Sequence, residues 1–155
     1  MTTTILHRPE RIVVGIDGSV ASHAAVRWAV THARSGDTVT LAHAWQPSPA
    51  MIEAGLVDPD DESCAERFVQ RELARIEALP RDGEITLTTE VLRGDARDRL
   101  TGASADLIVV GAGGHNRLLS AVLGSVSQHL ARHARVPVVV IPLADAIDSE
   151  IALCQ

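Results

Sequence analysis

The sequence predicts an α/β fold in which a parallel sheet of five strands is covered by helices on both faces. Hydrophobic residues make up 46% of the 155 residues and aromatic residues 2%, so the core is built from Val, Leu, Ile and Ala, as in parallel sheets. Short apolar runs alternate with segments of helical period along the chain. The length suits a single domain over 1–155, with its core at about 9–143 and a short C-terminal tail.

The first half of the chain supplies two strands, a helix and a long loop. The apolar run Arg11 to Ile16 predicts a strand, and the Ala-rich segment Val20 to Arg34 predicts a helix that stops before Gly36. Thr38 to Trp45 predicts the second strand. Gln46 to Asp61 carries three prolines and no clear period, so we expect a loop of about sixteen residues there.

The second half continues the alternation. Ser63 and Glu66 have the spacing of a capping box, which predicts a helix that starts there and keeps its apolar period to Leu79. Glu84 to Leu92 alternates polar and apolar side chains, as a strand at the sheet edge does. The remaining expected elements are a short helix, a strand, a helix and a last strand, over Asp95 to Ser104, Asp106 to Val110, Val126 to Ala134 and Val136 to Ile141.

The pattern of apolar residues also predicts the strand order. The first and fourth strands are the most uniformly apolar and should be central, whereas the alternating third strand belongs at an edge; right-handed crossovers then give the doubly wound order 3-2-1-4-5. In such a sheet a ligand lies where the winding direction reverses, outside the C-terminal ends of strands one and four. Asp17 ends the first strand and the glycines from Gly111 follow the fourth, so two signals meet at one predicted crevice.

Charge and residue usage exclude several classes of function. The net charge is −6 and all 14 basic residues are Arg, so Schiff-base chemistry and a Walker A lysine are excluded. An acidic chain without a basic run is a poor nucleic-acid binder. The apolar runs are too short to span a membrane and the N-terminus does not resemble a signal peptide. We therefore expect a soluble cytoplasmic protein with reduced thiols that binds neither nucleic acid nor membrane.

The stretch GAGGHNRLLSAVLGSVSQ, from Gly111 to Gln128, carries the clearest chemical signal. Glycines let the backbone approach an anion closely, so amides near Gly114 and Gly124 can converge on phosphate oxygens. Ser125 and Gln128 have capping-box spacing, which predicts Ser125 as the N-cap of the following helix. Glycines at a strand-to-helix junction can also merely permit a turn, and their spacing alone does not separate the two interpretations.

Other phosphate-binding patterns do not fit the chain. GIDGSV after the first strand lacks the third glycine of GxGxxG, and no acidic residue clearly ends the second strand. GxxxxGK[ST] is absent. A response-regulator-like protein would need clustered acids after the first strand and a Lys near the last, and this chain has one acid there and no Lys.

Three segments together resemble the universal stress protein family, in its ATP-binding branch. They are VVGIDGS on the first strand, GxxGx9G[ST] after the fourth and PVVVIP on the last. The resemblance runs from Arg11 to Pro142. It implies a Rossmann-like fold of the adenine nucleotide alpha hydrolase type and an ATP-binding stress-response regulator with Mg²⁺ as counterion. It also implies a homodimer paired through Val138–Ile141 and a regulatory protein partner of unknown identity.

The resemblance assigns roles to individual residues. Asp17 and Ala44 would contact adenine, largely through backbone groups. Gly15 would lie under the nucleoside and Gly111 near the ribose. The triphosphate would be held by Gly114, Gly124, Ser125 and Ser127, with the amide of Val126 contributing and Arg117 as a further candidate. His115 and Asn116 replace a further Gly-rich run, which changes the loop's stiffness and affinity.

Three functions remain open at this point. The first is a nucleotide-binding regulator with at most slow ATP hydrolysis; AMP or cyclic AMP is the alternative ligand. The second is an adenylating enzyme, although no SGGxDS loop is present. The third is an interaction scaffold whose glycine loop holds no nucleotide.

The remaining polar candidates have simpler interpretations. Cys64 and Cys154 lack metal-ligand spacing, and His129 and His133 lack a third ligand, so we expect no protein metal site. A lone strand histidine such as His43 is usually packed and hydrogen-bonded. The row of like charges on one helix is expected to be a solvated face moderated by nearby acids; it comprises Arg67, Arg71 and Arg75, with Glu72 and Glu77.

Overall fold

The computed structural model describes residues 7–47, 49–56, 60–79, 81, 83–113 and 123–142, with the backbone alone at 60 and 61. The strands are β1 (Arg11–Gly15), β2 (Thr38–Trp45), β3 (Thr86–Arg93), β4 (Leu107–Gly111) and β5 (Val138–Ile141). The helices are α1 (Val20–His32), α2 (Pro49–Glu53), α3 (Asp60–Glu77), α4 (Ala96–Thr101) and α5 (Ser125–His133). None of these described helices is long and apolar enough to cross a membrane.

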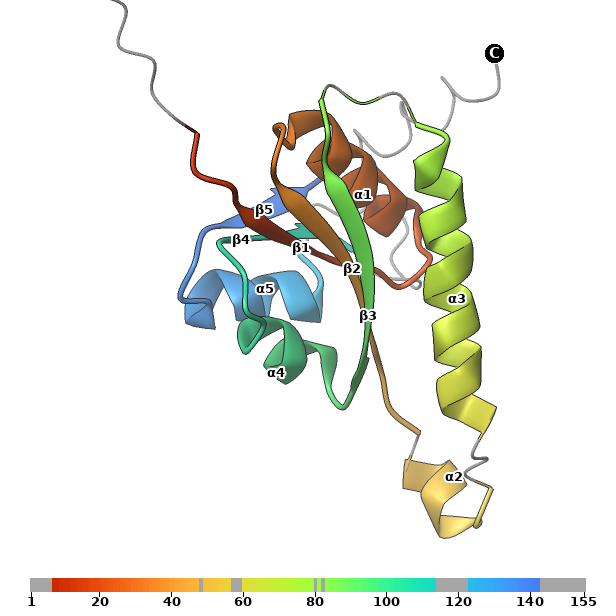
Figure 1. Ribbon diagram of the computed structural model, residues 1–155. Helices are drawn as coiled ribbons and strands as arrows, with labels where there is room; N and C mark the ends of the chain where they lie inside the picture. The colour runs from red at the N-terminus through yellow and green to blue at the C-terminus, as the bar shows by residue number, and fades with distance from the viewer. Residues whose placement is uncertain are drawn as a thin grey trace, which may run out of the picture.

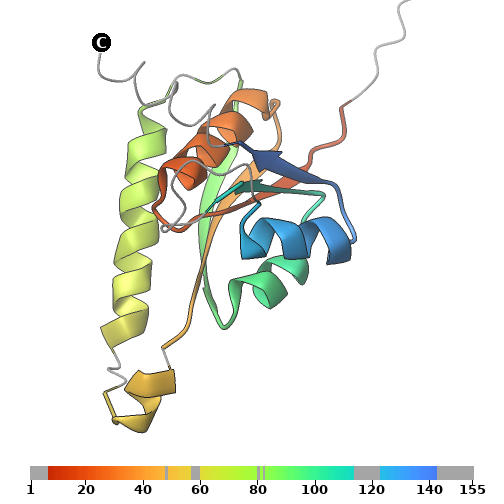
Figure 2. The same ribbon diagram turned by 180° about the vertical axis from the view of Figure 1, so that it is seen from behind.

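The strands form one parallel sheet in the order β3-β2-β1-β4-β5. Helices α1 and α3 cover one face, and α4 and α5 cover the other (Figures 1 and 2). The predicted α/β class and the order 3-2-1-4-5 are therefore confirmed. β3 lies at an edge of the sheet, as its alternating pattern predicted, and none of its residues is fully buried.

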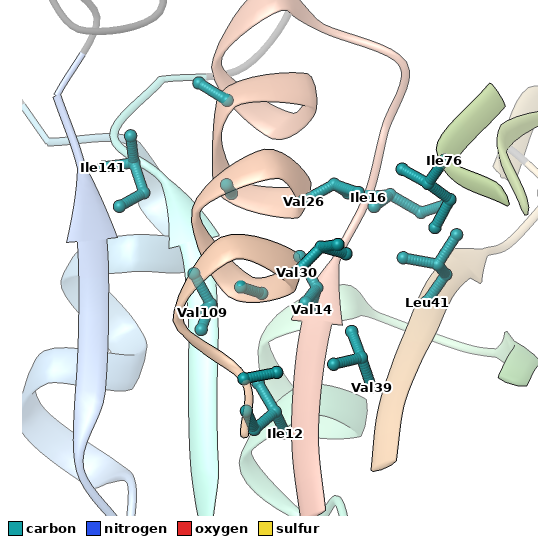
Figure 3. Packing of buried hydrophobic residues seen from close by; sticks show 14 of the residues in the cluster. Ile12, Val14, Ile16, Val26, Val30, Val39, Leu41, Ile76, Val109 and Ile141 are labelled. Atoms are coloured by element: carbon teal, nitrogen blue, oxygen red, sulfur yellow. The ribbon is translucent and has the colours of Figure 1, made fainter. Parts of the chain in front are cut away.

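The core consists of two apolar layers, one on each side of the sheet. On the α1 and α3 side, Val14, Val39 and Leu41 are fully buried (Figure 3). On the α4 and α5 side, Ile108 and Leu130 are each 1% exposed. The central strands are apolar on both faces because both of their faces are covered, which is the reason that their sequences read as continuous apolar runs.

The segment 46–61 differs from the loop that the sequence predicts. It contains α2, which starts at Pro49, and proline favours the first position of a helix because its missing N–H costs nothing there. Both views show α2 projecting away from the sheet (Figures 1 and 2). Helix α3 already begins at Asp60, so the predicted start at Ser63 was wrong. Acidic residues favour the positive end of a helix, and Asp60 opens an acidic run.

Other boundaries shift by one to three residues. The first helix ends at His32 because Ala33 already has an extended backbone, with φ −63° and ψ 143°. The last strand begins at Val138 rather than at Val136. The C-terminal tail from Leu143 lies outside the described residues.

The arginine row on α3 is exposed, as predicted, but Glu72 is not part of a solvated face. Its residue exposure is 6%, and its carboxylate lies 2.9 Å from Nε2 of His23 on α1. Arg75 Nη1 lies 3.3 Å from the same carboxylate. Glu72 therefore links α3 to α1.

A buried carboxylate ties the N-terminal segment to the turn before β2. Asp37 is 2% exposed and accepts hydrogen bonds from the amides of Glu10 and Arg34, both at 2.8 Å. His7 Nε2 lies 2.6 Å from the same carboxylate. Burial acts to raise the pKa of Asp37, but the hydrogen bonds outweigh it and the pKa is lowered from its usual value.

We expect Asp37→Asn to lower the free energy of unfolding by about 2 kcal/mol at neutral pH, because the amide group cannot accept from all these donors. Since the folded-state pKa of Asp37 is lowered, the stabilisation is present above the unfolded pKa of about 3.9 and is lost as the pH falls through the folded value. Urea unfolding of the wild type and the variant at neutral pH and at about pH 3 measures both effects. Glu90→Gln, at an exposed position on β3, is the control, and equal stabilities of wild type and Asp37→Asn at neutral pH would contradict the prediction.

Candidate functional site

A hollow of about 250 Å³ lies at the C-terminal ends of β1 and β4, where the strand order reverses. This is the crevice that the sequence predicts. Of the ten predicted site residues, eight line the hollow: Gly15, Asp17, Ala44, Gly111, Gly124, Ser125, Val126 and Ser127. The other two, Gly114 and Arg117, lie outside the described residues.

The turn after β1 places Asp17 at one wall of the hollow. Oδ1 of Asp17 accepts the amide N–H of Ser19 at 2.9 Å, a local side-chain bond that favours a turn. Gly18 has φ +77°, a conformation that other residues rarely adopt. A Cβ at Gly18 would also lie 3.2 Å from the ring of Phe68. The turn is therefore held by its own hydrogen bond, and Phe68 of α3 leaves little room for a side chain at position 18.

Helices α1, α4 and α5 all begin at this end of the sheet, but only two of them are capped by a side chain. Ser19 Oγ accepts the amide of Ser22 at 3.2 Å at the start of α1. Asp95 Oδ1 accepts the amide of Arg97 at 2.8 Å at the start of α4. The N-cap of α5 is Gly124, which makes no side-chain hydrogen bond. Because the first amides of a helix need acceptors from outside it, α5 is the best placed of the three to bind an anion.

The predicted capping box at Ser125 was wrong. Gly124, with φ −66° and ψ 164°, takes the N-cap position and Ser125 is the first helical residue. The side chain of Gln128 donates to the carbonyl of Leu123 at 2.9 Å, and Ser127 Oγ donates to the carbonyl of Gly124 at 3.0 Å. The amide of Ser125 therefore lies with those of Val126 and Ser127 at the positive end of the helix.

Packing is enough to explain the glycine at position 111. A Cβ at Gly111 would lie 2.6 Å from both the carbonyl carbon and the Cβ of Ala21. Glycine is therefore needed where β4 meets α1, whether or not a ribose lies nearby. A Cβ at Gly15 would lie 2.8 Å from Cδ1 of Leu100, a side chain that is 3% exposed.

The sequence interpretation missed the part of the site that α4 supplies. Ala96 and Leu100 line the hollow. The segment GDARD could have predicted that α4 contributes to the site, because Asp95 follows a strand and caps the helix. A right-handed crossover then brings the start of that helix to the C-terminal end of the sheet.

A second, more open hollow of about 550 Å³ adjoins the first. The two hollows share Ala44, Ala96, Ser125 and Val126. Its other lining residues include Trp45, Gln46, Asp95 and Arg97. Arg97 donates to Asp95 from Nε at 2.9 Å and from Nη2 at 2.7 Å. These bonds lower the pKa of Asp95 to about 2, so both side chains are charged at neutral pH.

The described histidines near these elements have packing and hydrogen-bonding contacts of their own. Among the described residues, no group of three His, Cys, Asp or Glu side chains could hold a metal ion. The rings of His129 and His133 stack with centroids 4.3 Å apart. His43 is packed and hydrogen-bonded as predicted: Nδ1 donates to the carbonyl of Ile16 at 2.9 Å, and the ring lies 4.6 Å from that of Phe68.

The sheet order and the hollow at the reversal point define an α/β protein with the adenine nucleotide alpha hydrolase-like fold. Residues 9–142 match the universal stress protein family. The chain belongs to this family.

Mycobacterial universal stress proteins are among its relatives. The chain is 33% identical over 140 residues to one from Mycolicibacterium smegmatis (strain ATCC 700084 / mc(2)155), covering 84% of this chain and 47% of the relative. It is 35% identical over 144 residues to one from Mycobacterium tuberculosis (strain ATCC 25618 / H37Rv), covering 88% of this chain and 48% of the relative. The chain thus spans about half the length of the curated relatives it matches.

Solved structures share the fold. The universal stress protein UspA from Lactobacillus plantarum has a TM-score of 0.65 at 24% identity, covering 87% of this chain and 99% of that one. A universal stress protein in complex with cAMP has a TM-score of 0.59 at 24% identity, covering 86% of this chain and 98% of that one. A universal stress protein family protein from Arabidopsis thaliana with AMP bound has a TM-score of 0.55 at 17% identity, covering 86% of this chain and 92% of that one.

Proposed function

We propose that this chain binds ATP and acts in the cytoplasm as a nucleotide-dependent regulator of the stress response. One observation carries the proposal: the first turn of α5, whose N-cap is Gly124, faces the same hollow as Asp17. A helix N-terminus without a side-chain cap favours a phosphate. The hollow therefore combines an anion site with a wall that a nucleoside can contact.

The residues present suit an adenine nucleotide. Ala44, Leu100 and Val110 give the hollow apolar walls against which a base can pack, while the amides of Ser125 and Val126 can donate to phosphate oxygens. Since the described residues hold no metal-ligand cluster, Mg²⁺ would be coordinated by phosphate oxygens and water. The ion would neutralise phosphate charge when bound.

AMP and cyclic AMP are the alternative ligands, and two solved structures of the family favour them. One family structure contains cAMP and another contains AMP. Comparing the three nucleotides therefore decides the ligand.

We expect ATP with Mg²⁺ to raise the melting temperature, because a ligand at a hundredfold excess over its Kd stabilises the folded state by about 2.7 kcal/mol. Differential scanning fluorimetry with ATP, AMP, cyclic AMP and GTP measures the shift. GTP is the control for recognition of the adenine base. A larger shift with AMP or cyclic AMP would identify that nucleotide, and not ATP, as the ligand. No shift with any nucleotide would favour the interaction scaffold.

We propose binding rather than turnover as the function of the site. Asp17 is the acidic side chain of the first hollow, and its carboxylate already accepts the amide of Ser19. That contact fixes Asp17 in its turn and makes it a poor general base for water. Phosphate release from ATP should be slow, and turnover of several per second would identify an enzyme instead.

We further propose that two copies pair through β5 and that the dimer contacts a regulatory protein. Strand β5 is the edge opposite β3 (Figure 1), and an uncovered edge strand can pair with another chain. Val138, Val139 and Val140 are partly exposed there. Equilibrium sedimentation should give twice the chain mass of 16.5 kDa, and a monomer at high concentration would remove this part of the proposal.

A further inference from the structure

We infer that the second hollow accepts the second nucleoside of a ligand in which two nucleosides are joined through a phosphate chain. The inference rests on the proposed function, because it takes the first hollow as the site of an adenine nucleotide. It extends that function from mononucleotides to dinucleoside polyphosphates.

The position of α5 carries the inference. Ser125 and Val126 line both hollows, so the first turn of α5 stands where the two hollows meet. A phosphate chain bound to these amides is therefore within reach of both hollows. Asp17 and Gly15 line only the first hollow, whereas Trp45 lines only the second.

The sizes of the two hollows point the same way. The first measures about 250 Å³. The second measures about 550 Å³, which is within the range of about 300–1,000 Å³ for small-molecule sites. A mononucleotide in the first hollow leaves the larger one without a ligand group.

The chemistry of the second hollow suits a nucleoside better than further phosphates. Its guanidinium, on Arg97, is already neutralised by two hydrogen bonds to Asp95, so little attraction remains for an extra anion. The Asp95 carboxylate and the Gln46 amide can hydrogen-bond ribose hydroxyls and base edges. Trp45 lines this hollow and adds an aromatic surface against which a base can pack.

The binding test compares diadenosine tetraphosphate with ATP, which has a similar negative charge but one nucleoside. We expect a Kd at least tenfold lower for diadenosine tetraphosphate, measured by isothermal titration calorimetry on the full chain with Mg²⁺. Equal affinities would overturn the inference and leave the proposed function intact. Failure of both ligands to bind would overturn both.

A variant that fills the second hollow makes the test specific. Gln46 is exposed at the end of β2 and lines only the second hollow, so Gln46→Trp should bring the two Kd values within about twofold while leaving the Kd for ATP unchanged. Gln70→Trp, on the exposed face of α3, is the matched control and should keep the tenfold preference. A preference that survives Gln46→Trp would place the second nucleoside elsewhere and overturn the inference.

Discussion

Replacing Gly124 by Asp is expected to weaken ATP binding at least a hundredfold with little change in the melting temperature. The backbone of Gly124, with φ −66° and ψ 164°, is one that an N-cap Asp adopts readily, and Asp is among the best N-cap residues. The new Cβ would lie 3.3 Å from the carbonyl oxygen of Ala112, a tight contact that offsets the stabilisation from the cap. The new carboxylate would accept the amides of α5 and repel a phosphate there. Two like charges 4 Å apart near a protein surface repel by about 4 kcal/mol.

The matched control for this variant is Gly124→Asn, which has the same shape without the charge. We expect it to lose about tenfold in affinity, since its side-chain oxygen competes for the same amides but does not repel the ligand. Calorimetry with ATP and thermal unfolding measure the two properties separately. If Gly124→Asp binds ATP as tightly as the wild type, the phosphates do not lie at α5.

The second large effect is expected from Gly111→Ala, which should lower the free energy of unfolding by about 3 kcal/mol. The added Cβ would lie 2.6 Å from the carbonyl carbon and from the Cβ of Ala21, so β4 and α1 would have to separate. Forced overpacking of this kind costs about 1–3 kcal/mol and occasionally more. Urea unfolding of the full chain measures the loss.

Gly102→Ala is the control for this prediction. Its Cβ would lie 3.4 Å from the carbonyl oxygen of Asp98, an ordinary contact, so we expect a change within about 0.5 kcal/mol. Equal stabilities of Gly111→Ala and Gly102→Ala would mean that the close approach of β4 to α1 is not needed.

The arrangement of the sheet could be predicted because the pattern of apolar residues depends on how many faces of each strand are covered. Strand β1 is buried over the apolar run Ile12 to Val14, whereas β3 has no buried residue and its exposure alternates along most of its length. Strand type and strand order both follow from this contrast. The position of the crevice follows in turn, because the reversal of winding order is a property of topology alone.

Helix starts were harder to predict, since both capping boxes identified by spacing were wrong. Ser63 lies inside α3, and Ser125 lies one residue inside α5. A residue caps a helix only if its backbone is extended, and spacing does not contain that information. At Gly124 the backbone is extended and no side chain is present, so the sequence pattern pointed to its neighbour.

The contribution of α4 could not be predicted from residue types. Ala96 and Leu100 are ordinary helix residues whose importance comes from the wall of the hollow that they form. The pairing of Asp95 with Arg97 likewise depends on the rotamers of both side chains. By contrast, Asp17 and the glycines after β4 stood out because polar or flexible residues directly follow buried strands.

The contacts of Asp37 have a practical consequence for the design of fusions and immobilised samples. Because Asp37 holds His7 and Glu10, a polypeptide joined ahead of His7 enters the fold where the strands begin. The two hollows lie at the end where the strands finish. A surface tether or a neighbouring domain attached at the N-terminus therefore leaves the route for an incoming ligand open, so binding can be measured on molecules anchored in this way.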